Sequence, residues 1–574
     1  MKKPLLSELT LREKIGQMLA PHQWDVYGKG GVTDASSKCN IEEVKACYEK
    51  EQFGTIRGEQ VGVYYTVPGN DKQTNNVEGY VEGSLLANYK TKVDTETYRK
   101  FLENHNSYVK IPIVVGGDCV IGGASVFNEL SWIINCAAIG AADSEELTFA
   151  LGAAVAREMR CAGINWRWCP VVDLGNRNSY STLRTFAIDD PERTVKHAIA
   201  YLKGMQSEGV ASCVKHFPSE GRMEARDSHF TSTSNPDTME EWWTEQGKVY
   251  KEVLAAGAYS VMVGHQSFPA MDDKKINGKY VPATISKKII TDLLKGQLNF
   301  DGVVITDGIR MAGLYSLMPY EELVVELVNA GNDVLLGCEV YSGDLIEAAV
   351  LDGRIPESRI NDACQRVLDM KEKLGMFEDN YYNLPYKAED VVGETRRISE
   401  EIAKRSITLV RDNFGLLPLS KKDIKKVSVI ISTHTEHFTS NLDALKKAFE
   451  DRGIEVYMQR RLKNSAELKE ISDNSDLIIY AAYLGMHQPA GYPRFFGDEA
   501  ASFYHAFNHG KEKSIGVSFG YPYIHYDTME NVDTFINAYN PQPETMRAFV
   551  SAILGEIEIV GKSPVLLIPR ANSR

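Results

Sequence analysis

The amino-acid sequence predicts an α/β protein with two parts, an N-terminal TIM-like (β/α)8 barrel and a C-terminal three-layer α/β sandwich. Three observations carry this prediction. The chain has 574 residues, which is more than one hydrophobic core usually holds. Two blocks of short apolar runs alternate with amphipathic helical stretches, as in α/β folds. In the first block the apolar runs end in charged or imidazole side chains, as expected at the carboxyl face of a barrel.

The first block begins near residue 110. Its runs are apolar throughout, which is typical of parallel strands that are buried on both faces. They cover residues 111–118, 164–174, 211–217, 259–265, 302–307 and 333–337. Between them lie helical patterns such as 191–209, which begins with proline and ends with glycine. Reactive side chains at the strand ends are Asp118, Asp173, Lys215, His216, His265 and Asp307. An open, doubly wound sheet would alternate similarly, but convergence of so many strand ends on one site favours a closed barrel.

The N-terminal segment, residues 1–19, reads as an amphipathic helix capped by Ser7 or Thr10. It lacks the apolar core of a signal peptide, and no run in the chain is long enough to cross a bilayer. The nine cysteines show neither CxxC nor zinc-type spacing, which indicates reduced, buried thiols. These features predict a cytoplasmic protein.

The second block follows a polar, aromatic stretch at 378–394, which we interpret as a linker. The predicted boundaries are 1–377 for the barrel, 378–395 for the linker and 396–574 for the sandwich. A helix is expected over 396–410, and apolar strands follow, such as 425–432 and 476–484. The block contains no GxGxxG or P-loop pattern, which argues against nucleotide binding. Residues 28–95 have weak periodicity and predict no element.

The charge balance restricts the possible partners. The chain has 78 acidic and 64 basic residues, with a formal net charge of −14 and no concentrated basic run. Nucleic acid and anionic membranes are therefore disfavoured as partners. Carboxylates and histidines lack metal-ligand spacing, so neither a metal nor another cofactor is expected. The sequence makes no prediction of an oligomeric state.

Two segments carry candidate catalytic groups. In 214–230, Asp227 precedes His229 by two residues, and a carboxylate so placed can orient the imidazole and raise its pKa, as a general acid requires. Solvated polar residues in a loop are the alternative interpretation of this pair. Asp307 ends a buried strand, where a carboxylate is costly unless it is hydrogen-bonded or functional. Capping of the next helix is the alternative for Asp307.

Several motifs, in chain order, resemble glycoside hydrolase family 3, and within it the bacterial β-N-acetylglucosaminidases. The first half of the chain contributes LTLREKIGQML (9–19), NWRWCPVVDLGNRN (165–178), TLRTFAIDDPE (182–192), KHFPSEG (215–221) and DSH (227–229). The rest contributes VMVGHQSFPAMD (261–272), PATISKKIITDLLK (282–295), FDGVVITDGIRM (300–311) and IAKRSITLVRDNFGLLPL (402–419). The resemblance thus runs through most of the chain.

The resemblance implies a role for each candidate. Asp307 would attack the anomeric carbon and form a glycosyl-enzyme intermediate. His229, held by Asp227, would protonate the leaving oxygen and then activate water. The Asp-Ser-His motif indicates the hexosaminidase branch, so the expected activity is that of a retaining, exo-acting β-N-acetylhexosaminidase, most simply a β-N-acetylglucosaminidase. Its partner would be an amino-sugar glycoside.

Other matching positions would hold the terminal sugar: Asp118, Arg184, Lys215 and His216. His265 matches a position near this pocket, where a role in supporting the barrel is equally open. Trp166 and Trp168 could stack on a sugar, although alternation along a strand favours packing on one side of it.

The chain also departs from the family pattern near the pocket. Residues 118–123 lack the family's glutamate, Ser219-Glu220-Gly221 stands for Gly-His-Gly, and Gly308 replaces an aspartate. These departures leave the identity of the sugar and of the leaving group open.

The sequence leaves three alternative functions open. A family 3 β-glucosidase or β-xylosidase is disfavoured by the Asp-Ser-His motif. A β-N-acetylhexosaminide phosphorylase is compatible with it, because a histidine acid/base does not repel phosphate as a carboxylate would. A non-catalytic sugar-binding protein could also keep the fold.

Overall fold

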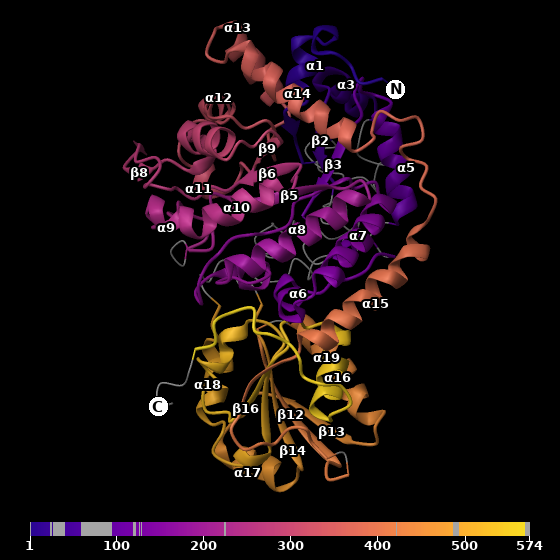
Figure 1. Ribbon diagram of the computed structural model, residues 1–574, viewed down its shortest axis with the longest axis vertical. Coiled ribbons are helices and arrows are strands. Elements are labelled where there is room, and N and C mark those ends of the chain that lie inside the picture. The colour runs from indigo at the N-terminus through magenta and orange to yellow at the C-terminus, as the bar shows by residue number, and fades with distance from the viewer. Residues whose placement is uncertain are drawn as a thin grey trace.

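The computed structural model describes residues 2–22, 26, 41–58, 94–118, 122–125, 127, 129–222, 226–420, 422–434, 436–485 and 493–568. Most of the stretch 28–95, together with Cys39 and Cys119, lies outside the described residues. The molecule is elongated, with a barrel at one end and a sandwich at the other (Figure 1).

Eight parallel strands close the barrel. Six of them form one sheet in the order β2 (Thr55–Arg57), β3 (Val114–Gly117), β4 (Trp166–Arg167), β5 (Ala211–Phe217), β6 (Ser260–Val263) and β9 (Val303–Thr306). The other two, β1 (Leu19–Ala20) and β10 (Leu335–Leu336), pair with each other. Parallel bridges from His22 to Arg57 and from Ile305 to Val334 join the two sheets into a ring. The predicted TIM-like fold is confirmed.

The barrel interior is filled by side chains that face inward from the strands. Trp166 and Trp168 are fully buried there, with ring centroids 6.3 Å apart. The Trp166 Nε1–H donates to Ser260 Oγ at 2.7 Å. Gly116 on β3 is needed because a Cβ at that position would lie 2.5 Å from the Trp168 ring. Both tryptophans therefore pack in the core, as the alternation along the strand favoured.

Helices cover the outside of the barrel. In the first half of the barrel sequence these include α1 (Leu11–Gly16), α3 (Ile41–Glu51), α5 (Thr95–Asn106), α7 (Glu145–Cys161) and α8 (Pro191–Ser207). Later ones are α10 (Gln246–Ala255), the π-helix η6 (Lys288–Gln297), α12 (Tyr320–Ala330), α13 (Ser342–Leu351) and α14 (Glu357–Lys373). Thr10 caps α1 in a capping box with Glu13, and Asp190 caps α8 ahead of Pro191. These polar caps fix where the helices begin.

The sandwich has one six-stranded sheet between two helical layers. The strand order is β11 (Thr408–Asp412), β16 (Thr534–Asn537), β15 (Ser514–Ser518), β14 (Leu477–Tyr483), β12 (Lys426–Thr433) and β13 (Glu455–Arg460). Along β14, Leu477, Ile479 and Ala481 join the core cluster that includes helices α16 (Glu436–Glu450) and α19 (Pro543–Ile553). The alternate residues Ile478 and Tyr480 join the cluster of α17 (Ser465–Asp473) and α18 (Gly497–Tyr504). Burial on both faces explains why β14 is apolar throughout.

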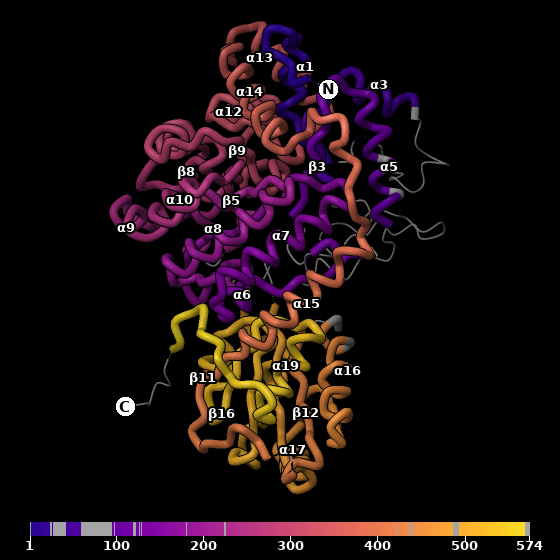
Figure 2. The backbone as a smooth tube through the Cα atoms, turned by 45° about the vertical axis from the view of Figure 1, so that its right-hand side comes forward, coloured from indigo at the N-terminus to yellow at the C-terminus, as the bar shows by residue number. Residues whose placement is uncertain are grey.

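Helix α15 (Ala388–Ser406) connects the two parts and packs against α6 (Cys136–Ala142), α7 and α19 (Figures 1 and 2). It begins within the stretch 378–395. The prediction of one helix over 396–410 is wrong at its end, because residues from Thr408 form β11, which pairs antiparallel with β16. The cause is tertiary, since an edge of the sheet is available for these β-branched and apolar residues. The domain boundaries themselves stay predictions.

Among the described residues, no helix is both long and apolar enough to cross a membrane. Seven cysteines are described, and all are free thiols: Cys47, Cys136, Cys161, Cys169, Cys213, Cys338 and Cys364. Burial raises the pKa of the Cys136 thiol to about 12, which makes this thiol unreactive at neutral pH.

Candidate active site

The carboxyl ends of the barrel strands carry the side chains that the sequence singled out. Asp307 directly follows β9, Asp118 directly follows β3, and His265 lies two residues beyond β6. Lys215 and His216 lie near the carboxyl end of β5. The remaining three, Arg184, Asp227 and His229, lie in the loops that follow β4 and β5. All eight therefore belong to one face of the barrel.

Asp118 is surrounded by cations. The Lys215 Nζ donates to Asp118 Oδ1, and the Arg57 Nη2 donates to Oδ2 at 3.3 Å. Burial alone would raise the pKa of Asp118, but the charges of Lys215, Arg57 and Arg184 hold it well below its ordinary value. The cluster therefore offers an ionised acceptor beside several fixed donors, which is the chemistry needed to bind sugar hydroxyls.

Sequence reasoning did not find Arg57. It ends β2, a strand of three residues inside the stretch that showed no periodicity. Its guanidinium lies 5.5 Å from the centroid of the Trp168 ring, above the packed barrel core. A basic residue directly after two β-branched residues, Thr55 and Ile56, was the available signal.

His216 is fixed by Asp173, which is fully buried. The His216 Nδ1–H donates to Asp173 Oδ2 at 2.8 Å, and this tautomer follows because a carboxylate can only accept. Asp173 Oδ1 accepts the backbone N–H groups of His216 and Glu220 at 3.1 and 2.9 Å. Atoms of Asp173, His216 and Glu220 lie within 4.8 Å of one another, close enough to hold a metal ion. Because three N–H groups already occupy Asp173, hydrogen bonding accounts for this arrangement.

Asp307 is positioned by the backbone of the barrel. Its N–H donates to the Val263 carbonyl at 2.9 Å, and its Oδ1 accepts from the Gly308 N–H at 2.7 Å. Burial would raise the pKa of Asp307, but the charges of His216, His265, His229 and Lys215 lower it to about 2. Asp307 is therefore an ionised carboxylate at neutral pH.

Asp227 and His229 form a close pair. Asp227 Oδ1 accepts both the backbone N–H and the Nδ1–H of His229, at 2.9 and 2.7 Å. Burial would lower the pKa of His229, but the hydrogen bond to Asp227 and the charges of Asp227, Asp307 and Glu220 raise it above its ordinary value. The structure thus brings the imidazole and Asp307 close enough to influence each other's ionisation.

The loop that carries His229 is held by contacts that the sequence did not predict. Ser228 Oγ donates to Glu220 Oε1 at 3.0 Å, and the Ala312 N–H donates to the His229 carbonyl at 2.9 Å. A Cβ at Gly313 would lie 2.5 Å from the Thr231 carbonyl oxygen and 2.6 Å from that of Ser228. The loop therefore packs directly on α11 (Ala312–Tyr315), the helix that follows Asp307.

His265 supports the turn after Asp307. Its Nε2–H donates to the Gly308 carbonyl at 2.9 Å, so Nδ1 accepts from the Thr284 hydroxyl at 3.0 Å. Burial lowers the pKa of His265 below its ordinary value, so a smaller fraction of the ring is protonated at a given pH. Of the two interpretations left open by the sequence, this geometry favours the supporting role.

Comparison with known proteins adds three findings. The family model of the glycosyl hydrolase family 3 N-terminal domain matches residues 10–370. A β-N-acetylglucosaminidase/β-glucosidase from Cellulomonas fimi is 29% identical over 494 residues, covering 80% of this chain and 84% of that protein. Similar folds occur in a β-glucoside phosphorylase, BglX (TM-score 0.79), and in a β-N-acetylglucosaminidase from Paenibacillus sp. (TM-score 0.75). Both are 24% identical, covering 98% and 97% of this chain and 94% and 99% of theirs.

Proposed function

Because the chain belongs to glycosyl hydrolase family 3 and is a glycosidase, we propose that it is a retaining, exo-acting β-N-acetylhexosaminidase. The observation that carries this proposal is the 2.7 Å contact between Asp227 and His229, beside the ionised Asp307. A histidine at this position takes the part that a second carboxylate plays in most retaining glycosidases. The relative from Cellulomonas fimi is named for both β-N-acetylglucosaminidase and β-glucosidase activity, and the first of these is compatible with the proposal.

In the first half of the proposed reaction, an Asp307 oxygen attacks the anomeric carbon and the glycosidic C–O bond breaks. The proton on His229 Nε2 moves to the leaving oxygen, so the departing alcohol is neutral. The raised pKa of His229 increases the protonated fraction of the ring near neutral pH, and the lowered pKa of Asp307 keeps the carboxylate ionised. The two groups are therefore in the ionisation states that this step requires.

In the second half, the neutral imidazole accepts a proton from water as its oxygen attacks the glycosyl–Asp307 ester. This step releases the sugar with retained configuration and restores the starting ionisation of both groups. Asp227 stabilises the imidazolium again as it forms. The same pair thus serves as acid and then as base.

The pocket for the terminal sugar is proposed to consist of Asp118, Lys215, Arg57, Arg184 and His216. His216 presents its Nε2 because Nδ1 is bound to Asp173.

A phosphorylase is the second candidate function. Like a hydrolase, it would use Asp307 and His229, with phosphate in place of water. The histidine favours it, because an acid/base that is never anionic does not repel phosphate. The β-glucoside phosphorylase of similar fold is consistent with this alternative.

A panel of 4-nitrophenyl glycosides, assayed with and without phosphate, tests both candidates. A hexosaminidase should cleave the β-N-acetylglucosaminide, or its galacto-epimer, far faster than the β-glucoside. Preference for the β-glucoside would overturn the proposal. Formation of a sugar 1-phosphate when phosphate is added would establish the phosphorylase instead.

We also propose a cytoplasmic location. The free thiols of the described cysteines support it, since thiols persist in reducing compartments. Cell fractionation with an antibody against the native protein tests this point. Recovery in the extracellular fraction would contradict it.

A further inference from the structure

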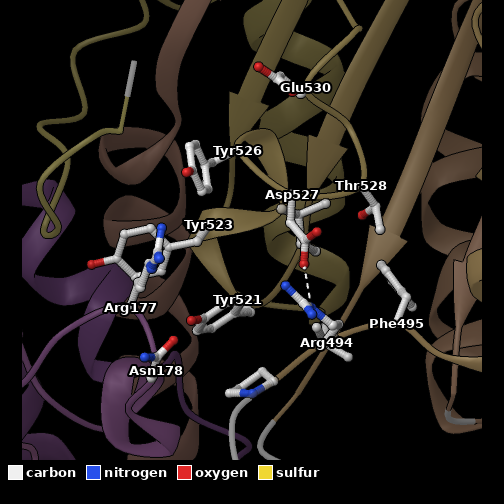
Figure 3. Close-up of a pocket in the computed structure, with 13 residues that line it drawn as sticks. Arg177, Asn178, Arg494, Phe495, Tyr521, Tyr523, Tyr526, Asp527, Thr528 and Glu530 are labelled. Atoms are coloured by element: carbon white, nitrogen blue, oxygen red, sulfur yellow. Dashed lines mark hydrogen bonds and ion pairs between the residues drawn. The ribbon is translucent and has the colours of Figure 1, made fainter. Parts of the chain in front are cut away.

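A second cavity lies between the barrel and the sandwich. It has a volume of about 560 Å³ and is bounded by Arg177 of the barrel and by Arg494, Tyr521, Tyr523, Tyr526 and Asp527 of the sandwich (Figure 3). None of the proposed catalytic or sugar-binding residues lines it. The sandwich residues follow β14 and β15, whose carboxyl ends point toward the barrel. Carboxyl ends of parallel strands are where open α/β sheets commonly bind ligands.

The lining combines aromatic faces with planar charged groups. The Tyr521 and Tyr523 rings are 5.3 Å apart, and the guanidinium of Arg177 lies 5.2 Å from the centroid of the Tyr526 ring. The Arg494 Nε–H donates to Asp527 Oδ2 at 3.0 Å (Figure 3). Aromatic rings can cover the C–H face of a sugar, while guanidinium and carboxylate groups meet its hydroxyls.

The charge of the lining argues for a neutral ligand. Two arginines, Arg177 and Arg494, are balanced by two carboxylates, Asp527 and Glu530. An anion or a cation in the cavity would therefore face one carboxylate or one guanidinium unfavourably, whereas a neutral ligand would not.

The cavity is connected to the proposed active site through one tightly packed loop. Arg177 lies between Asp173, which holds His216, and Arg184. In this loop the Gly175 N–H donates to the Ile188 carbonyl at 2.7 Å. A Cβ at Gly175 would lie 2.4 Å from the Gly221 carbonyl oxygen, so the loop is pressed against the segment that contains Glu220. The cavity therefore borders the carboxyl face of the barrel.

From these observations we propose that the cavity is a second saccharide-binding site, which takes a neutral sugar unit separately from the catalytic pocket. The proposal extends the proposed function, and its ligand is either a further unit of the substrate or a separate saccharide. In this proposal the sandwich binds a sugar, although all the proposed catalytic residues belong to the barrel.

Titration calorimetry with N-acetylglucosamine and its β1,4-linked disaccharide tests the proposal on the full-length Asp307→Ala protein, which does not turn the ligand over. We expect two sites for N-acetylglucosamine, whereas the disaccharide fills one combined site if it spans both pockets and two sites if it does not. Adding Arg177→Ala and Tyr526→Ala should weaken one of them by about tenfold or more, because a charged hydrogen bond and a stacking face are lost together. Arg547→Ala, at an exposed arginine on α19, is the matched control and should leave both sites unchanged.

A single site for N-acetylglucosamine, or two sites that the Arg177/Tyr526 pair does not affect, would overturn the proposal. An unchanged thermal unfolding midpoint shows that the variant is folded. If the unfolding midpoint of the double alanine variant is lowered, the variant Arg177→Lys/Tyr526→Phe is used in its place. It keeps the charge and the ring, so the expected loss of affinity is smaller.

A kinetic comparison separates the two sources of the sugar. For this comparison the Arg177→Ala/Tyr526→Ala variant is made in the active protein, which keeps Asp307. If the cavity binds a further unit of the substrate, the variant raises KM for the disaccharide and not for the 4-nitrophenyl glycoside. For a separate saccharide, the two KM values respond equally. Because the calorimetry does not depend on turnover, failure of the proposed hexosaminidase activity would be distinguishable from failure of this site.

Discussion

The two groups proposed to perform the chemistry are held in different ways. Asp307 follows directly from strand β9, and its backbone N–H is bonded to the neighbouring strand through Val263 at 2.9 Å. His229 lies in an irregular loop, and side chains fix its position: Asp227 at 2.7 Å and, through Ser228, Glu220 at 3.0 Å. The backbone of the barrel thus positions the nucleophile, whereas a chain of side-chain hydrogen bonds positions the acid/base.

This difference has consequences for substitution. The backbone bonds of Asp307 survive any change of its neighbours' side chains, because the strand pairing supplies them. The loop of His229 depends on individual side chains, each of which can be removed. We therefore expect substitutions of the residues around each group to weaken the function of His229 more than that of Asp307.

Removal of the nucleophile should have the largest effect. Asp307→Ala closes the covalent route, so kcat on the 4-nitrophenyl β-N-acetylglucosaminide should fall by about 10⁴- to 10⁶-fold. Steady-state assays measure the loss, and circular dichroism shows whether the barrel is intact. A variant with more than a few per cent of the activity would mean that another group attacks the sugar.

Removal of the acid/base should depend on the leaving group. In His229→Ala, a sugar leaving group no longer receives a proton, so the loss should be about 10²- to 10⁴-fold. A 2,4-dinitrophenyl group needs almost no proton, so attack by Asp307 should survive and the intermediate should accumulate. Mass spectrometry should then find the adduct on the peptide that contains Asp307. An equal loss for all leaving groups would contradict the assignment.

Weakening the support of His229 should shift the pH profile. Asp227 raises the pKa of His229, and the acid form is active, so kcat/KM falls as the pH rises through that pKa. Asp227→Asn removes the charge, so the basic limb should move to lower pH. The acidic limb should stay in place, because the pKa of Asp307 is set by several other charges. A basic limb that does not move would show that Asp227 does not set the pKa of His229 in the active enzyme.

The strands and loops also differ in how much the sequence predicted. The runs that became β5 and β9 were found because buried parallel strands are apolar throughout, and Asp307 and Lys215 followed from their position at the strand ends. Strands β1 and β2, with two and three residues, are too short for a periodic pattern, so Arg57 was missed. Local patterns also could not reveal that Thr408 would leave a helix for a sheet edge.

The contacts that hold the His229 loop were not predictable for a related reason. Glu220 was noted only as a departure from the family pattern. Its bond to Ser228, and the contact of His229 with Ala312, join segments whose proximity depends on the folded barrel. Sequence patterns identify chemical groups, whereas tertiary packing decides which of them meet.

A matched pair of glycine substitutions compares the segment beside Asp307 with the loop that carries His229. At Gly313 a Cβ would lie 2.5 Å from the Thr231 carbonyl oxygen, so Gly313→Ala must displace the His229 loop. At Gly308, beside the nucleophile, the nearest atoms to a Cβ are those of Met311 at 3.8 Å. We expect Gly313→Ala to lower kcat by about tenfold or more, since small displacements of catalytic groups are costly, and Gly308→Ala to cost less. The reverse order would show that the loop is the more tolerant region.

The smallest expected effect comes from the link between Glu220 and Ser228. Each group is buried, and the serine lies between Asp227 and His229. Loss of one hydrogen bond to a carboxylate should lower kcat/KM by about tenfold or less. If Glu220 acts through Ser228, Glu220→Ala and Ser228→Ala should each produce most of the loss, and the double variant should add little, which is the signature of coupling in a double-mutant cycle. Glu220→Gln keeps an acceptor for the hydroxyl and should recover part of the rate. Additive losses would instead assign the Glu220 carboxylate to its contact with His216 Nδ1 at 3.5 Å, and the loop would then depend on Asp227 and Ala312 for its position.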